Sequence, residues 1–156
     1  MSEEKNVFLG PSSQVLNFGA FALAAVVTGI ALFFAVSFHP ALAIILVVPA
    51  AYAIWKYLVL RFRIYEITTE RIKITTGILT RKTDELELYR VKDLTLVEPL
   101  HLRLFKLGNI VLTTNDATTP SIEIVAIPGA KEIREELRRH VEACRQRKGV
   151  RLTEFE

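Results

Sequence analysis

The first third of the chain is a continuous stretch of apolar and uncharged residues. Residues 6 to 55 contain no Asp, Glu, Lys or Arg, and a charge at the centre of a bilayer costs about 2.5–3.5 kcal/mol. One helix of this length would be about twice as long as the hydrocarbon core is thick. Pro40, in the segment SFHPA, disfavours helical backbone at His39. The pattern therefore predicts two membrane-spanning helices, residues 15–37 and 41–60, joined by a tight turn.

A secretory signal peptide is the alternative explanation for an apolar run near the N-terminus. Such a peptide has a basic start and an apolar core of about 7–15 residues. This chain starts with the acidic pair Glu3 and Glu4, and its apolar run is far longer. We therefore expect spanning helices. Lys and Arg are absent from the connecting turn and abundant after the second helix, so the positive-inside rule places both termini in the cytoplasm.

The two predicted helices are rich in small residues. In the first helix these residues recur every four positions, a spacing that lets another helix approach closely. We expect the second helix, rather than a second copy of the chain, to be the partner. A proline within the second helix predicts a kink. The residues concerned are Ala20, Ala24, Thr28, Ala25 and Gly29 in the first helix, and Ala43, Pro49, Ala50 and Ala53 in the second.

After residue 60 the hydrophobic period changes from that of a helix to that of a strand. The segment RFRIYEITTERIKITTGILTRKT alternates polar and apolar positions, and Gly77 predicts a bend before the strand resumes at Ile78 and Leu79. The segments ELELYRV, LTLVEP, NIVLTT and SIEIVAI predict further strands. LHLRLFKLG predicts a short helical turn that ends at Gly108. From Pro128 a charged helix with one apolar stripe follows.

These elements divide the chain into a membrane part and a soluble part. The soluble part is expected to contain six or seven antiparallel strands closed by the C-terminal helix. Its apolar stripe comprises Ile133, Leu137, Val141 and Cys144. The predicted organisation is a cytoplasmic tail (1–14), two transmembrane helices (15–60), a cytoplasmic domain (61–148) and a C-terminal tail (149–156).

Several segments of the soluble part match a known pattern in order and spacing. They are Tyr65–Ile72 (YEITTERI), Gly77, Leu88–Leu94 (LYRVKDL), Leu104–Leu112 (LFKLGNIVL) and Val125–Pro128 (VAIP). With two preceding transmembrane helices, they resemble the pleckstrin-homology (PH)-like domain of small bacterial YdbS-like membrane proteins. The resemblance implies a PH-like split β-barrel of about seven antiparallel strands capped by a C-terminal helix, preceded by a membrane helical hairpin. It also implies a prokaryotic cytoplasmic (inner) membrane, and it implies no chemistry.

Candidate catalytic and metal-binding residues are few. The histidines His39, His101 and His140 lie far apart and lack the spacing of a metal site. Cys144 is the single cysteine, and its place on the apolar stripe favours a buried structural role. Nucleotide-binding loops and nucleophile motifs are missing from the sequence. We therefore expect a protein without catalytic activity, metal or other cofactor.

Cations are concentrated between residues 56 and 82, where seven Lys and Arg face two Glu. Juxtamembrane cations attract anionic headgroups by about 1 kcal/mol each, and a PH-like barrel also offers a sheet edge and a groove for a protein. The mixed charge of residues 57–156 argues against nucleic acid as a partner. We expect an adapter or assembly subunit that binds a membrane protein or a second copy, and the alternative is a sensor of anionic lipid. The candidate headgroup contacts are Lys56, Arg61, Arg63, Lys73, Arg81 and Lys82.

Overall fold

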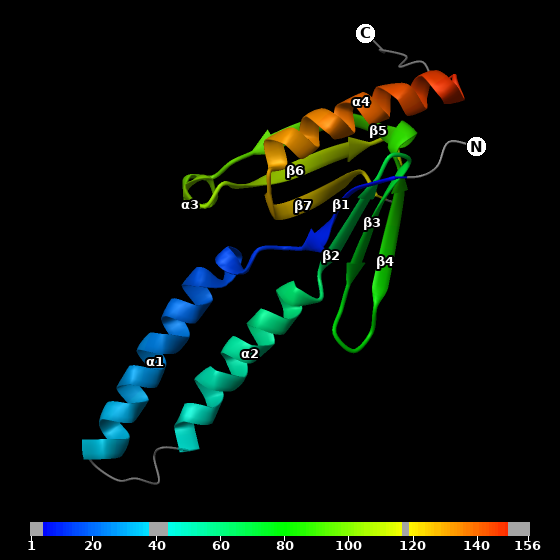
Figure 1. Ribbon diagram of the computed structural model, residues 1–156. Coiled ribbons are helices and arrows are strands. Elements are labelled where there is room, and N and C mark those ends of the chain that lie inside the picture. The colour runs from blue at the N-terminus through cyan, green and yellow to red at the C-terminus, as the bar shows by residue number, and fades with distance from the viewer. Residues whose placement is uncertain (1–4, 38–43, 117–118, 150–156) are drawn as a thin grey trace.

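The computed structural model describes residues 5–37, 44–116 and 119–149. Two helices, α1 (Phe18–Ser37) and α2 (Val47–Arg61), lie side by side and project away from the rest of the molecule (Figure 1). Both apolar segments are long enough to cross a membrane, at 24 residues for Gln14–Ser37 and 18 for Ile44–Arg61. Most of the turn predicted at residues 37–41 lies outside the described residues.

The part of the chain that the structure describes has seven strands in two antiparallel sheets. Helix α4 (Ala130–Lys148) lies across the second sheet (Figure 1). This arrangement confirms the predicted fold class, a split barrel capped by a C-terminal helix and joined to an apolar helical pair. The first sheet has the order β1 (Asn6–Pro11), β2 (Ile64–Thr68), β3 (Arg71–Thr76) and β4 (Lys82–Glu87), and the second has β5 (Val91–Val97), β6 (Leu107–Thr114) and β7 (Ser121–Pro128).

Strand β1 was not predicted, because residues 1–14 were expected to form a tail. It pairs antiparallel with β2, with Leu9 opposite Glu66 and Gly10 opposite Tyr65. Its sequence NVFLGP shows little alternation, ends in glycine and proline, and belongs to the uncharged run that signals the membrane helices. The strand means that α1 and α2 are an insertion between two neighbouring strands of the barrel.

This insertion defines two ends of the barrel. We call the end where β1 leaves the sheet and β2 enters it the helix end. Because the strands are antiparallel, the loop from β3 to β4, residues 77–81, also lies at the helix end. Figure 1 shows that this loop extends toward α2 and that α3 (Leu100–Leu104) lies on the α1 side of the barrel. We call the opposite end, with the β2–β3 turn, the far end.

Helix α4 covers the core with the stripe that the sequence predicted. Leu137 is fully buried, Val141 and Cys144 are buried, and Ile133 packs beside them. Their partners are side chains from both sheets, including Tyr65 and Ile110. Three basic residues lie in the last turn of α4, where they interact favourably with the helix dipole. The apolar stripe therefore holds the two sheets under one helix.

Two local elements differ from the sequence prediction. Ile78 and Leu79 do not resume a strand, because Gly77 has a φ of 111° and the chain turns so tightly that an added Cβ would lie 1.9 Å from the Thr80 carbonyl oxygen. The short helix α3 does not end at Gly108. It ends at Leu104, with Phe105 as its C-cap residue, and Lys106 follows with a φ of 55°. In both places, the β3–β4 loop and the segment around α3, apolar side chains are exposed.

The contact between α1 and α2 also differs from the expected pattern. The buried residues of α1 are Ala24, Ala31 and Ala35. They are separated by seven and then by four positions, whereas the sequence predicted a spacing of four throughout. This heptad-like stripe is typical of helices that cross at a shallow angle. Pro49 was expected to kink the second helix. It lies in the first turn of α2, where a backbone N–H has no intrahelical acceptor, so the proline removes no hydrogen bond from the helix.

Candidate functional site

The structure places the six predicted headgroup cations in three different environments. Lys56 lies on α2 with its ammonium 5.7 Å from the centre of the Tyr52 ring, and Lys73 lies in the middle of β3. The other four, at the helix end, are Arg61, Arg63, Arg81 and Lys82. The six cations therefore do not converge on one pocket.

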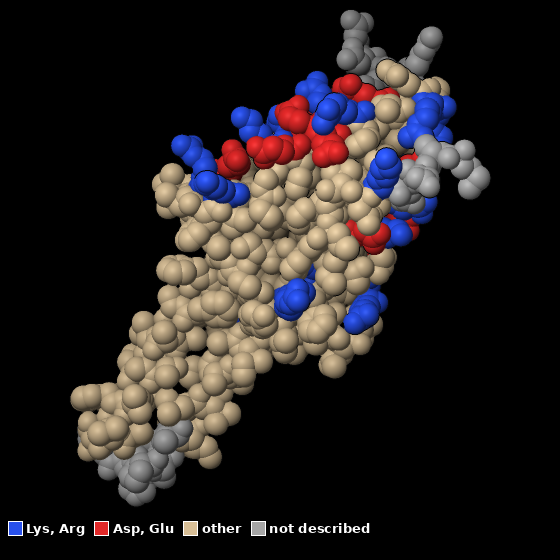
Figure 2. All heavy atoms as spheres, in the orientation of Figure 1, with Lys and Arg blue, Asp and Glu red and all other residues tan. Residues whose placement is uncertain are grey.

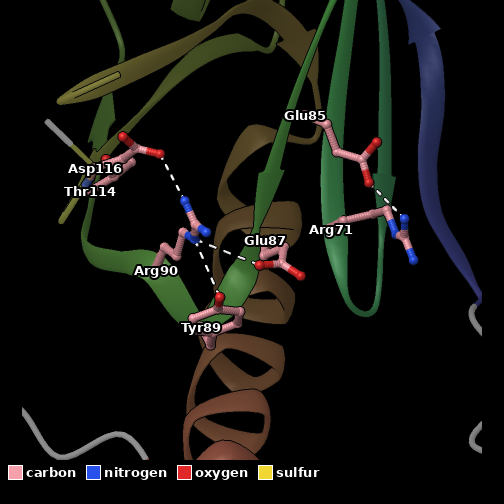
Figure 3. Close-up of polar contacts among 7 residues, drawn as sticks. All are labelled: Arg71, Glu85, Glu87, Tyr89, Arg90, Thr114 and Asp116. Carbon is pink, nitrogen blue, oxygen red and sulfur yellow. Dashed lines mark hydrogen bonds and ion pairs between the residues drawn. The ribbon is translucent and has the colours of Figure 1, made fainter. Parts of the chain in front are cut away.

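Acidic side chains neutralise much of the charge on β3 and β4. Lys73 lies opposite Glu66 on one neighbouring strand and Glu85 on the other. Arg71 donates a hydrogen bond of 2.6 Å to Glu85 (Figure 3), and Lys82 lies 2.9 Å from Asp84. The pairs between strands stabilise the sheet, whereas the Lys82–Asp84 pair lies within β4. Together these pairs leave little net charge for a phosphate group on the surface of the sheet.

A polar junction that the sequence did not reveal ties β1 to the second sheet. Ser12 is 2% exposed, and its hydroxyl donates to the Val125 carbonyl at 2.9 Å. The Ser13 amide donates to the Ala126 carbonyl at 3.0 Å, and the Val125 amide donates to the Tyr65 hydroxyl at 3.1 Å. These bonds fix the chain just before α1 begins. The sequence pattern Ser12-Ser13 before an apolar helix suggests a helix cap, which Ser13 provides for Val15.

A groove lies between β5 and α4, with a volume of about 310 Å³. One wall is the start of β5, and the other is the exposed side of α4. We call it the β5–α4 groove. The residues that line it are Val91, Lys92, Asp93, Leu94, Arg134, Arg138, Val141, Glu142 and Arg145.

The β5–α4 groove is basic. It has four cations and two acids among its lining residues, a net charge of +2. Arg134 pairs with Glu135 beside the groove and lowers the pKa of that carboxyl group, mainly by a hydrogen bond. Arg138 lies 3.4 Å from Glu142. These ion pairs are exposed to water, so they can exchange partners at little cost.

Strand β5 is one of the two terminal strands of its sheet, with β6 on one side. On its other side, Arg145 donates hydrogen bonds to the Val91 carbonyl and, at 3.1 Å, to the Lys92 carbonyl. Within the described residues, strand pairing continues no further beyond β5. A terminal strand presents backbone donors and acceptors that can pair with another strand. The groove therefore combines a terminal strand, two of whose carbonyls already accept from Arg145, with a basic wall.

The edges of β7 and β4 are less suited than that of β5 to bind an extended segment. At β7, Ser12 and Ser13 bind the backbone of Val125 and Ala126. Strand β4 is also terminal, but the described part of α4 has its main contacts with β1, β5, β6 and the short 3-10 turn after β4. Of the edges of β4, β5 and β7, that of β5 therefore has the described part of α4 beside it to recognise side chains.

A second hollow, of about 280 Å³, lies at the far end. Its lining mixes acids and bases, and Arg147 lies 3.2 Å from Glu70 within it. The hydrogen bond that Arg147 donates to Cys144 is the main cause that raises the pKa of the arginine. Cys144 is buried and forms no disulfide. The ion pair occupies this hollow and joins the end of α4 to the β2–β3 turn.

Arg90 closes the junction between the two sheets beside this hollow. Its guanidinium lies 2.8 Å from Asp116 and 3.6 Å from Glu87, and it donates to the Tyr89 hydroxyl at 3.3 Å (Figure 3). The Tyr89 hydrogen bond is the main cause that raises the pKa of Arg90. Arg90 thus has a structural role, linking the turn after β4 to the end of β6.

Among residues 5–37, 44–116 and 119–149, no group of three His, Cys, Asp or Glu is close enough together to hold a metal ion. Figure 2 shows charged side chains gathered along α4 and around the far end, whereas the helical pair is almost free of charge on the face drawn. The described surface offers terminal strands, hollows and charged side chains as possible contacts.

Comparisons with known proteins agree with this architecture. The model of the bacterial PH domain family matches residues 15–141. Searches of curated proteins and of solved structures found no match. The matched segment includes both apolar helices and six of the seven strands, those after β1. The chain therefore belongs to the bacterial PH domain family.

Proposed function

We propose that this protein is a membrane-anchored, non-catalytic adapter that binds another protein at the cytoplasmic face of a prokaryotic inner membrane. In this proposal α1 and α2 span the bilayer and both termini are cytoplasmic, because Lys and Arg follow α2. The PH-like barrel then presents a docking site to proteins in or near the same membrane. Anchoring raises the effective concentration of such partners.

The observation that carries the proposal is the β5–α4 groove. An extended segment that pairs with β5 beyond the Val91 and Lys92 carbonyls that Arg145 holds would extend the sheet through main-chain hydrogen bonds, and alternate side chains would point toward α4. Lys92, Arg134 and Arg138 would meet those side chains. Because the groove carries a net positive charge, the partner segment it fits best is extended and acidic.

The alternative, a sensor of anionic lipid, has support from the four cations at the helix end. Their position beside α2 is expected for any protein that follows the positive-inside rule. The acids on β2 and β4 that lie beside Lys73 and Lys82 weaken a specific headgroup site around these two lysines. In our proposal these cations orient the domain on the membrane, and the protein partner is recognised elsewhere.

Reversing one charge in the groove tests the proposal. Arg138→Glu should weaken binding of an extended acidic peptide about tenfold, or about 1.4 kcal/mol, because it replaces an attraction by a repulsion. Arg139→Glu is the matched control, since Arg139 is exposed and adjacent but does not line the groove. The full chain in detergent micelles would be titrated with a panel of fluorescent acidic peptides and with basic peptides of equal length. Equal loss in both variants would contradict groove binding.

A further inference from the structure

Two apolar surfaces flank the point where the helical pair joins the barrel. On the α2 side, the β3–β4 loop has Leu79 at its tip, 92% exposed. On the α1 side, Leu100 and Leu104 of α3 are 74% and 77% exposed, and Phe105 is 58% exposed. Water-exposed leucines of this kind are costly to leave unpartnered when they gather in one region.

The strand order brings both surfaces to the helix end. The β3–β4 loop must lie there because β1 and β2 open toward the helices at the same end of the sheet. The loop borders α2 directly, since Ile78 and Leu79 line a hollow of about 230 Å³ with Trp55 and Val59. Figure 1 shows the loop beside the end of α2.

The surface on α3 borders the other helix in the same way. Phe105 lines a hollow of about 310 Å³ with Val15, Leu16 and Phe18. Leu100 and Leu104 are four residues apart, so they lie on one side of α3. Leu102, on the other side, is buried and anchors α3 to the barrel.

Charge around these surfaces identifies their occupant. Arg63 lines the hollow beside the loop, and Arg81 and Lys82 follow Leu79 in the chain. Arg103 and Lys106 flank the apolar residues of α3. Apolar side chains surrounded by cations, next to helices with exposed Trp55 and Tyr57, match the interface of a bilayer with anionic headgroups.

We propose that the β3–β4 loop and α3 both insert into the headgroup region of the membrane that α1 and α2 span. Leu79 enters on the α2 side, and Leu100 and Leu104 enter on the α1 side. This inference rests on the proposed membrane anchoring. The two contacts fix the tilt of the barrel, so that α4 and the β5–α4 groove face away from the bilayer. The loop from β3 to β4 is thus a membrane contact in addition to the helices.

Single-cysteine labelling of the full chain tests this inference. In a Cys144→Ala background, one cysteine would replace Leu79, Leu104, Val27 or Arg139, and each would carry an environment-sensitive fluorophore. The protein would be reconstituted in vesicles of phosphatidylcholine and phosphatidylglycerol. Quenching by lipids with a spin label near the headgroup, and by iodide in the water, reports the surroundings of each probe. The probe at Val27, on α1, reports whether this helix lies in lipid. The probe at Arg139, on the exposed side of α4, is the reference for a position in water.

Probes at positions 79 and 104 should have blue-shifted emission, be quenched by the spin-labelled lipid and be protected from iodide, unlike the probe at 139. If the probe at 27 is protected from iodide but those at 79 and 104 are quenched like the probe at 139, the inference is overturned. The proposal that α1 and α2 span the membrane is then still supported. If the probe at 27 is itself open to iodide, the proposed anchor fails and the inference fails with it. Insertion of only one of the two leucines overturns the two-sided contact.

Discussion

Two lysines in the middle of α1 should prevent the protein from integrating into the membrane. Val26 and Ile30 lie one turn apart on the same side of α1 and are 59% and 54% exposed. Each lysine near the centre of a spanning helix costs about 2.5–3.5 kcal/mol, so Val26→Lys with Ile30→Lys costs about 5–7 kcal/mol. The measurement is the fraction of the protein that resists alkaline extraction from membranes.

The matched control replaces the same two residues by leucine, which keeps the helix apolar and should leave integration unchanged. This comparison separates a membrane helix from a helix that is merely exposed. On the surface of a water-soluble protein, lysine at these positions would be harmless or would improve solubility. Normal integration of the lysine variant would show that α1 does not lie in lipid.

The second large effect concerns the contact between α4 and the barrel. Leu137→Ala should lower the free energy of unfolding of the domain by about 2–5 kcal/mol, because Leu137 is fully buried and the substitution leaves a cavity between the two sheets. Hydrogen exchange of β6 amides in detergent-solubilised protein measures this loss, since these amides are in the barrel core.

Arg139→Ala is the control for that experiment, because Arg139 lies on the exposed side of the same helix. Its effect on the free energy of unfolding should stay within about 0.5 kcal/mol. Similar exchange rates in the Leu137→Ala variant and the unmodified protein would mean that α4 is not part of the folded unit. The β5–α4 groove would then lose one of its two walls.

Sequence patterns predict the elements whose residues meet one strong physical requirement, either a lack of charge along a helix or burial of one side of a helix or strand. The absence of charge between residues 12 and 55 predicts long apolar helices, and α1 and α2 lie within this run. The alternation in β2, β3 and β6 and the stripe on α4 follow from burial on one side. These signals are local, so a single sequence suffices to locate them.

Elements set by contacts distant in sequence were not predicted. Strand β1 exists because it pairs with β2, more than 50 residues later, and its own residues show no clear strand pattern. The loop at Ile78 and Leu79 resembled a strand because both residues are apolar, yet the turn at Gly77 and the helix beside it determine its shape. In both cases the missing information was the position of α1 and α2 relative to the barrel.

The candidate site likewise depends on contacts between residues that are distant in the sequence. Cations between residues 56 and 82 form a cluster in the sequence, but β-pairing places Lys73 between glutamates and leaves Arg61 and Arg63 beside the helices. The cations of the β5–α4 groove come from β5 and from α4, about 40 residues later in the chain. In the sequence they look like the solvated charges of an ordinary amphipathic helix. Only the packing of α4 beside the edge of β5 turns them into one surface.

Photo-crosslinking in native membranes tests the central claim, that the β5–α4 groove binds a protein. A crosslinking residue would replace Lys92 in the groove or, as the control, Arg139 outside it. The account predicts one recurrent protein product from position 92 and none from 139. That product should be lost in the Arg138→Glu variant and displaced by acidic peptide. Crosslinks from position 92 to lipid alone, or a protein product that Arg138→Glu leaves unchanged, would contradict it.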